Sequence, residues 1–239
     1  MLTYLTKHHY PCPAQVKNAQ GAYGSMYRNK PYVIYELVEG QSIEHPSFHH
    51  WQQLVQKAAE LQVLTQDFHS QYTPYRWNYD SDLCRTLAHA EATRINAQSA
   101  RNKFTWLAHE LPTLDLPPSL HKGICHCDIH FSNVLFQGDK LVALLDFDDA
   151  NYTFLQFDLV GLFEYWAWPH TIDRLDITKA RGVVQEYMKH CPLTPIEQRH
   201  LYDVYKLSIL FDCVWYFSRG FADDCYEKRK IEALHNLGT

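Results

Sequence analysis

Apolar residues follow two different spacings in the first third of the chain. Over residues 32–37, within PYVIYELV, β-branched and aromatic residues dominate and alternate between two faces, which predicts a strand. The preceding RNK predicts a hairpin turn. Over residues 47–71 apolar residues recur at intervals of three and four, which predicts one face of a long amphipathic helix with Ser47 as its N-cap.

The rest of the chain is expected to be mostly helical. Two short strands, NVLF (133–136) and KLVALLDF (140–147), are predicted as a hairpin that turns at Gly138-Asp139. Helices are predicted over 2–9, 81–110 (with a break allowed), 153–168, 171–190, 194–221 and 223–236. The pattern therefore predicts an α+β protein, with a small strand-rich start and a helical body that carries one embedded hairpin.

Composition and charge exclude several classes of protein. The 46% hydrophobic and 21% charged residues are typical of globular proteins, and the net charge of −5 provides no basic surface for nucleic acid or for anionic membranes. The first residues lack a secretory signal, and no stretch approaches ~18 apolar residues, so we expect a cytoplasmic protein without a transmembrane helix. The seven cysteines are odd in number and scattered, which favours reduced thiols.

The segment ICHCDIHFSNVLF (124–136) concentrates the candidate chemistry. It supplies His126, Asp128, His130 and Asn133 just before the predicted hairpin, whose second strand ends at Asp146. Antiparallel pairing brings the start of one strand beside the end of the other, so Asp128 and Asn133 are expected to lie near Asp146. Carboxylate and amide oxygens suit a hard cation such as Mg²⁺, whereas imidazole and thiolate would suit zinc.

The spacing within this segment is typical of kinases. His-x-Asp is followed by Asn five residues after the Asp, and then by a strand that ends in Leu-Asp-Phe. In such sites the Asp accepts the proton of the attacking hydroxyl, while Asn and the second Asp hold Mg²⁺ on the phosphates. A single His-x-Asp would be weak evidence, but the two motifs at hairpin separation are a strong signal.

The stretch from Gly123 to Leu162 resembles the aminoglycoside phosphotransferase and choline kinase superfamily, and is most similar to the branch with the type II homoserine kinases. The family pattern is roughly H-G-D-x-H-x-x-N-x-L, a hairpin, I-D-[FW]-x-x-A and a later Asp-Leu. This chain matches it at His126, Asp128, His130, Asn133, Asp146, Ala150 and Asp158. The resemblance implies a protein-kinase-like fold with a reduced N-lobe over residues 1–40 and a helical C-lobe over 41–239.

The resemblance also implies roles for the matching residues. Asp128 would be the catalytic base, with His126 as its catalytic companion. For His126 we expect hydrogen bonds that orient the loop rather than metal binding. Asn133 and Asp146 would bind Mg²⁺.

Other residues are expected to support the catalytic loop or to contact the nucleotide. Asp158 would brace the catalytic loop from the start of a helix, and His130 is expected to have a structural role. YVIYELVEG resembles the hinge between lobes, so the Glu36 carbonyl and the Val38 amide would meet the adenine of ATP, with Tyr35 lining the pocket. His69 fits the Leu-x-x-Leu-His helix ending of the family.

Two departures from the family pattern stand out. Position 127 is Cys where the family usually has Gly, which we expect to change loop packing more than chemistry. The hinge begins near residue 32, which leaves no room for the first strands of an N-lobe, its glycine-rich loop or its phosphate-pairing Lys. We expect a misplaced gene start, a truncated relative, or a partner that supplies the missing part.

The acceptor site is less defined by the sequence. By analogy with the family, the aromatic-rich helices at 161–168 and 209–221 are the substrate-facing candidates, although each aromatic residue has core packing as its simpler explanation. Asp212, Tyr216 and Arg219 fall at i, i+4 and i+7 and share a helix face. Such a face would suit an amine-bearing or hydroxylated substrate. Cys125 and Cys127 are expected to be a packed strand residue and a tolerated small residue.

Three functions follow as hypotheses. The first is a kinase that uses ATP and Mg²⁺ to phosphorylate a hydroxyl of a homoserine-, choline- or aminoglycoside-like small molecule. The second is an inactive binding or regulatory module, motivated by the missing phosphate-binding elements. The third, and weakest, is a zinc hydrolase built on His126, Asp128 and His130, for which the sequence offers no second Cys/His pair at suitable spacing.

Overall fold

The computed structural model describes residues 1–66, 68, 69, 71, 78–168, 175–222 and 226–235. Its strands are β1 (Gln15–Val16), β2 (Gly24–Tyr27), β3 (Lys30–Tyr35), β4 (Lys122–Cys125), β5 (Val134–Gln137), β6 (Lys140–Leu144) and β7 (Asn151–Phe154). Its helices are α1 (Leu2–Lys7), α2 (Phe48–Thr65), α3 (Ser81–Ile95), α4 (Gln98–Glu110), α5 (Gln156–Ala167), α6 (Ile177–Met188), α7 (Pro195–Arg199), α8 (Leu201–Ser218) and α9 (Tyr226–His235). Short 3₁₀ turns cover Leu111–Thr113, Phe131–Asn133 and Phe147–Asp149.

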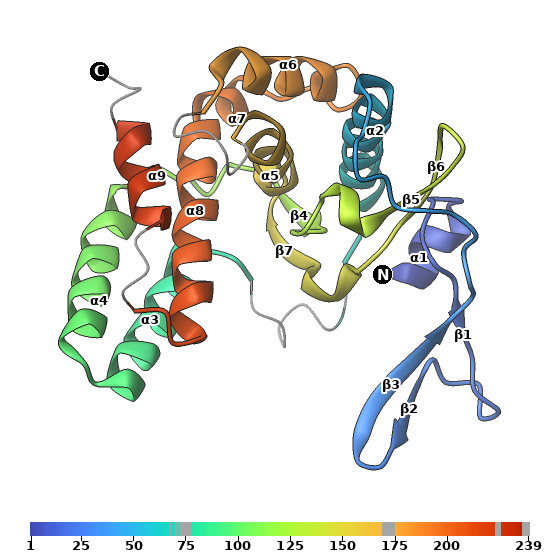
Figure 1. Cartoon of the computed structure of the whole chain (residues 1–239), viewed down its shortest axis with the longest axis horizontal. Coiled ribbons are helices and arrows are strands. Elements are labelled where there is room, and N and C mark those ends of the chain that lie inside the picture. Colours follow the sequence, from blue (N-terminus) through green and yellow to red (C-terminus); the bar gives the residue numbers. More distant parts are fainter. Residues whose placement is uncertain (67, 70, 72–77, 169–174, 223–225, 236–239) are drawn as a thin grey trace.

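The N-terminal strands form a separate antiparallel sheet in the order β1-β3-β2. Arg28 and Asn29 have positive φ angles of 49° and 62°, the backbone of the predicted turn between β2 and β3. Figure 1 shows this sheet to one side of the molecule, away from helices α3, α4, α8 and α9. The fold therefore separates a small sheet from a helical body, as the sequence pattern predicts.

The helical body buries one hydrophobic core. Ser47 caps α2 as predicted, and its hydroxyl accepts a hydrogen bond from the His50 amide. Trp51, Leu54 and Val55 on the apolar face of α2 are almost completely buried. Helix α5 packs against both α6 and α8, so it occupies the middle of the helical body (Figure 1).

The predicted hairpin is present as β5 and β6, with Gly138 in the turn at φ 59°. A second ladder was not predicted: β4 pairs with β7 in antiparallel register, from Lys122 opposite Phe154 to Cys125 opposite Asn151. The prediction of a helix from residue 153 was therefore wrong at its start, because residues 151–154 form β7 and α5 begins at Gln156. The short strand NYTF carries no periodicity of its own, and its partner lies far away in sequence.

Other helix boundaries also differ from the predictions. The predicted 81–110 region is broken at Asn96, which adopts the left-handed conformation that ends α3. The predicted helix over 194–221 is interrupted at His200, where α7 ends and α8 begins, and α8 ends at Ser218. His69 lies beyond the end of α2 and is exposed. Residues 171–174 and 223–225, within two predicted helices, lie outside the described residues.

No helix among the described residues is long and apolar enough to cross a membrane.

Candidate active site

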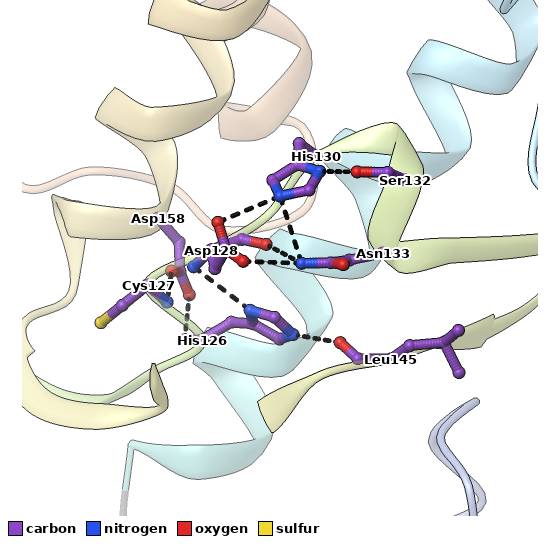
Figure 2. Close-up of polar contacts among 8 residues, drawn as sticks. All are labelled: His126, Cys127, Asp128, His130, Ser132, Asn133, Leu145 and Asp158. Atoms are coloured by element: carbon purple, nitrogen blue, oxygen red, sulfur yellow. Dashed lines mark hydrogen bonds and ion pairs between the residues drawn. The ribbon is translucent and has the colours of Figure 1, made fainter. Parts of the chain in front are cut away.

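The loop that follows β4 is held by Asp158, at the start of α5. This carboxylate is 2% exposed and accepts hydrogen bonds from the backbone amides of His126 (2.9 Å) and Cys127 (2.8 Å) and from the side chain of Gln62 (2.5 Å). Burial raises the pKa of Asp158, and the charge of His126 and these donors oppose that rise. These contacts join the loop to α2 and α5, as the bracing role predicted for Asp158 requires. Figure 2 shows Asp158 beside His126 and Cys127 of the loop.

His126 is completely buried, and both of its ring nitrogens are engaged. The Asp128 amide donates to Nδ1 (3.2 Å), and Nε2 donates to the Leu145 carbonyl oxygen (2.7 Å). A metal ion could bind a ring nitrogen of His126 only by displacing one of these hydrogen bonds. The geometry therefore argues against the zinc hydrolase hypothesis. His126 can position the loop but cannot touch a substrate, so we place it as a positioning residue and not as a catalytic one.

Asp128 is the part of the loop that remains accessible, with a side chain that is 39% exposed. Its Oδ2 accepts a hydrogen bond from Asn133 Nδ2 (2.7 Å), and its Oδ1 lies 3.1 Å from His130 Nε2. The hydrogen bond from His130 holds the pKa of Asp128 below its usual value, with support from the charge of His130 and from Asn133, against a smaller rise due to burial. Asp128 is therefore an ionised carboxylate at neutral pH.

The position of His130 is fixed from its other side. Its Nδ1 lies 2.5 Å from the hydroxyl oxygen of Ser132, and its ring stacks on Tyr165 with a centroid separation of 6.1 Å. Figure 2 shows the His130 ring between Asp128 and Ser132. These contacts are consistent with the predicted structural role of His130, which orients the Asp128 carboxylate.

Cys127 has a backbone φ of 67°, in the left-handed region that glycine tolerates best. This conformation favours glycine, and the Cys127 side chain is accommodated against an unfavourable backbone. Burial raises the pKa values of both Cys127 and Cys125 well above the ordinary value. Both thiols are therefore protonated at neutral pH and are not poised as nucleophiles or metal ligands.

Asn133 and Asp146, the predicted Mg²⁺ ligands, lie at the open end of the β5–β6 hairpin. The Asn133 carbonyl oxygen accepts a hydrogen bond from the amide of Leu145, the residue just before Asp146 (2.8 Å). The Asn133 side-chain nitrogen points at Asp128, and its oxygen points away from it (Figure 2). Asp146 is exposed and has a positive φ of 57°.

This donor set fits Mg²⁺, which uses one or two carboxylates and retains its waters for phosphate. The described residues contain no group of three or more His, Cys, Asp or Glu side chains able to hold a metal, as a structural zinc site would require. Asn133 and Asp146 offer side-chain oxygens of the kind that Mg²⁺ prefers.

The predicted hinge lies against the same hairpin. Gln41 and Phe136 exchange two backbone hydrogen bonds of 2.9 Å, and a Cβ on Gly40 would come within 3.1 Å of the Phe136 carbonyl oxygen. A side chain at position 40 would therefore crowd the hairpin, whose neighbouring atoms would have to shift by a few tenths of an ångström. Glu36 and the side chain of Tyr35 are exposed, and Val38 is half-buried. The partial desolvation of the Tyr35 hydroxyl and the nearby charges of Asp148 and Asp146 raise the pKa of Tyr35.

A cavity of about 900 Å³ opens beside Asp128. Its walls come from the loop after β4 and from α5, α6, α8 and α9. They include Cys127, Asp128, His130, Asp158, Gly161, Glu164, Tyr165, Trp168, Lys179, Ser208, Asp212, Trp215, Tyr216 and Lys230. Of the three predicted substrate residues, the structure brings Asp212 and Tyr216 to this cavity. Arg219 does not line it: α8 ends at Ser218, and the exposed Arg219 guanidinium lies over the Trp215 ring at 4.6 Å.

Sequence reasoning missed the ion pair between Glu164 of α5 and Lys230 of α9, which forms part of the wall. Tyr165 follows Asp158 by seven residues, about two helical turns, so a helical projection of α5 would have placed it on the cavity side. Glu164, six residues after Asp158, does not share that projected side. No sequence signal points to Lys230, because the pair joins two helices that are distant in the chain.

The chain is similar in sequence and in fold to known phosphotransferases. Residues 1–188 match the Phosphotransferase enzyme family. The chain belongs to this family. Homoserine kinases are similar to it: that of Rhodospirillum rubrum is 31% identical over 200 residues, and that of Parvibaculum lavamentivorans 28% identical over 201. Each alignment covers 82% of this chain and 60% of the relative, so the chain spans less than two thirds of their length.

Solved structures show the same fold. An amicoumacin kinase in complex with AMP-PNP and Ca²⁺ superposes with a TM-score of 0.66 at 15% identity, covering 98% of this chain and 72% of that chain. A microcompartment-associated aminopropanol kinase gives a TM-score of 0.62 at 17% identity, covering 98% of this chain and 75% of that chain. The predicted α+β, protein-kinase-like fold and the family resemblance are both confirmed.

Proposed function

We propose that this protein is a kinase that transfers the γ-phosphoryl group of ATP to a hydroxyl group of a small amino alcohol. The observation that carries the proposal is Asp128, an accessible carboxylate held by Asn133 and His130 at the edge of a 900 Å³ cavity. Membership of the Phosphotransferase enzyme family and the similarity to homoserine kinases support the same reaction.

Each residue of the site has its own role in the proposed reaction. Asp128 orients the acceptor hydroxyl and takes its proton as the oxygen attacks the γ-phosphorus, while the bond to the β–γ bridging oxygen breaks and ADP leaves. Asn133 and Asp146 would hold Mg²⁺, which when bound neutralises the phosphate charges. The main chain of Glu36 and Val38, beside Tyr35, would contact the adenine.

The cavity supports an acceptor that carries an ammonium group. Asp212 and Glu164 place carboxylates in its wall, and Tyr165, Trp215 and Tyr216 add aromatic rings. Carboxylates and aromatic faces both attract cations. Lys230 pairs directly with Glu164 and neutralises it. Asp212 lines the cavity from α8, and we assign it to the acceptor's ammonium.

The proposal is tested by ADP release in the presence of Mg·ATP and an acceptor panel: L-homoserine, 1-amino-2-propanol, choline, spectinomycin and gentamicin. We expect turnover with at least one of the amines. Asp128→Asn should lower kcat by about 10²–10⁴-fold while the melting temperature stays within the range of the native protein. Asp82→Asn, on the exposed side of α3, is the matched control and should retain full activity.

A saturable thermal stabilisation by Mg·ATP without ADP release for any acceptor would contradict the kinase assignment. That outcome would favour the alternative of a nucleotide-binding regulatory module. Unchanged turnover in Asp128→Asn would instead show that Asp128 is not the base.

A further inference from the structure

Gly161 is a glycine that neither the backbone nor the packing of the protein requires. It lies in the interior of α5, in helical conformation, and its position is exposed. A Cβ added there would meet no atom within 4 Å outside its own helix and chain neighbours. Glycine is the poorest helix former apart from proline, so α5 would be more stable with almost any other residue at this position.

The surroundings of Gly161 indicate that glycine at this position serves the cavity and not the stability of the helix. Phe157 and Asp158 lie one turn before it and Glu164 and Tyr165 one turn after it, and all of these residues line the cavity beside Asp128. Gly161 lines the same cavity. The bare backbone at this position therefore forms part of the cavity wall, between a residue that holds the catalytic loop and one that borders the acceptor space.

Residues before and after Gly161 in α5 contact the loop that carries Asp128. Asp158, three residues earlier, accepts hydrogen bonds from the catalytic-loop amides of His126 and Cys127. Tyr165, four residues later, stacks on His130, which in turn contacts Asp128. A molecule whose hydroxyl reaches Asp128 would pass along this face of α5.

We propose that Gly161 is a specificity-determining residue for the phosphoryl acceptor. Its missing side chain leaves the space in which the carbon skeleton of an amino alcohol lies against the backbone of α5 while its hydroxyl reaches Asp128. This inference rests on the proposed function, because it takes the cavity to be the acceptor site. Side chains added at position 161 would exclude the acceptor in proportion to their volume, without affecting ATP.

The chain offers a matched control in Gly182. It also lies in the interior of a twelve-residue helix, α6, and a Cβ there would likewise meet nothing within 4 Å. Gly182 is not among the residues that line the cavity beside Asp128. Substitutions at the two glycines therefore share their effect on helix stability and differ in their effect on the cavity.

The experiment compares Gly161→Ala, Gly161→Leu, Gly182→Ala and Gly182→Leu. Both alanine variants should raise the melting temperature by about 2–4 °C, since alanine replaces glycine in a helix interior. Gly161→Ala should raise the acceptor KM about 3–10-fold and Gly161→Leu about 100-fold or more, with the KM for ATP within about twofold. Gly182→Ala and Gly182→Leu should leave both KM values unchanged.

Binding of L-homoserine, 1-amino-2-propanol and gentamicin, measured by calorimetry with AMP-PNP and Mg²⁺ present, gives a readout that does not require turnover. If the native protein binds an amine without phosphorylating it, the proposed function fails and the ratio of affinities between the Gly161 and Gly182 variants still decides the role of Gly161. Equal acceptor KM values or affinities in Gly161→Leu and Gly182→Leu would overturn the inference. It would also be overturned if the native protein bound none of the three amines.

Discussion

The N-terminal sheet and the catalytic loop are held together by opposite means. All six residues of β3 are exposed, including Ile34 at 55%, and the sheet depends on backbone ladders with β1 and β2. The catalytic loop depends on buried side chains, with His126 at 0% and Asp158 at 2% exposure. Backbone ladders tolerate many sequences, whereas a buried polar network requires particular side chains because unpaired polar groups are costly there.

This difference explains why one region carries a strong sequence signature and the other does not. The predicted adenine contacts of the hinge use main-chain atoms, so its side chains are free to vary. The loop needs His126, Asp128 and Asp158 in place at once, since each holds another. The contrast can be tested by substitutions on both sides.

The largest effect is expected from Asp158→Ala. Removing this carboxylate leaves the buried amides of His126 and Cys127 without their acceptor, which should lower the free energy of unfolding by about 3 kcal/mol. The melting temperature should fall by about 6–12 °C, and activity should fall with it. Asp82→Ala, at an exposed position of α3, should change the melting temperature little. A similar small change in Asp158→Ala would show that the loop is held by other contacts.

The buried strand β4 and the exposed strand β3 can be compared directly with one substitution. Ile124→Thr places a hydroxyl at a position of β4 that is 7% exposed and should lower the free energy of unfolding by about 1–3 kcal/mol. Ile34→Thr, on β3, should stay within about 0.5 kcal/mol. Denaturant titration measures both. Equal losses would mean that another surface covers β3 in solution.

Cys127 allows the backbone strain of the loop to be measured. Cys127→Gly relieves the cost of a side chain at φ 67° and should raise the stability by up to about 1 kcal/mol relative to Cys127→Ala, which removes the thiol and retains the strain. Thermal unfolding of the two variants is the measurement. A less stable Gly variant would indicate that the positive φ carries no strain.

His130→Gln should change the pH dependence of activity more than its maximum. The His130 hydrogen bond lowers the pKa of Asp128, so its loss should raise that pKa and move the acidic limb of the kcat/KM profile to higher pH. At alkaline pH, where Asp128 is ionised in both proteins, the two rates should converge. An unchanged acidic limb would show that the ionisation seen in the kcat/KM profile is not that of Asp128.

Much of the local structure was predictable because local residues decide it. The capping of α2 by Ser47 and the turns of the two hairpins follow from residues that lie within a few positions of each other. The motif around Asp128 was also visible in the sequence, because its residue spacing is typical of a kinase site. Arg219 is not among the residues that line the cavity, and helical spacing alone does not reveal that α8 ends at Ser218, one residue before it.

The sequence by itself determined the fold class, the family and the group of residues around Asp128, because each is encoded by periodicity or by motif spacing. Only the tertiary structure decided which side chains border the cavity, because its walls come from helices far apart in the chain. The pairing of β4 with β7, the Glu164–Lys230 ion pair and the open space at Gly161 all arise from such distant contacts. The residues of a short segment do not by themselves specify which distant segment will pack against it.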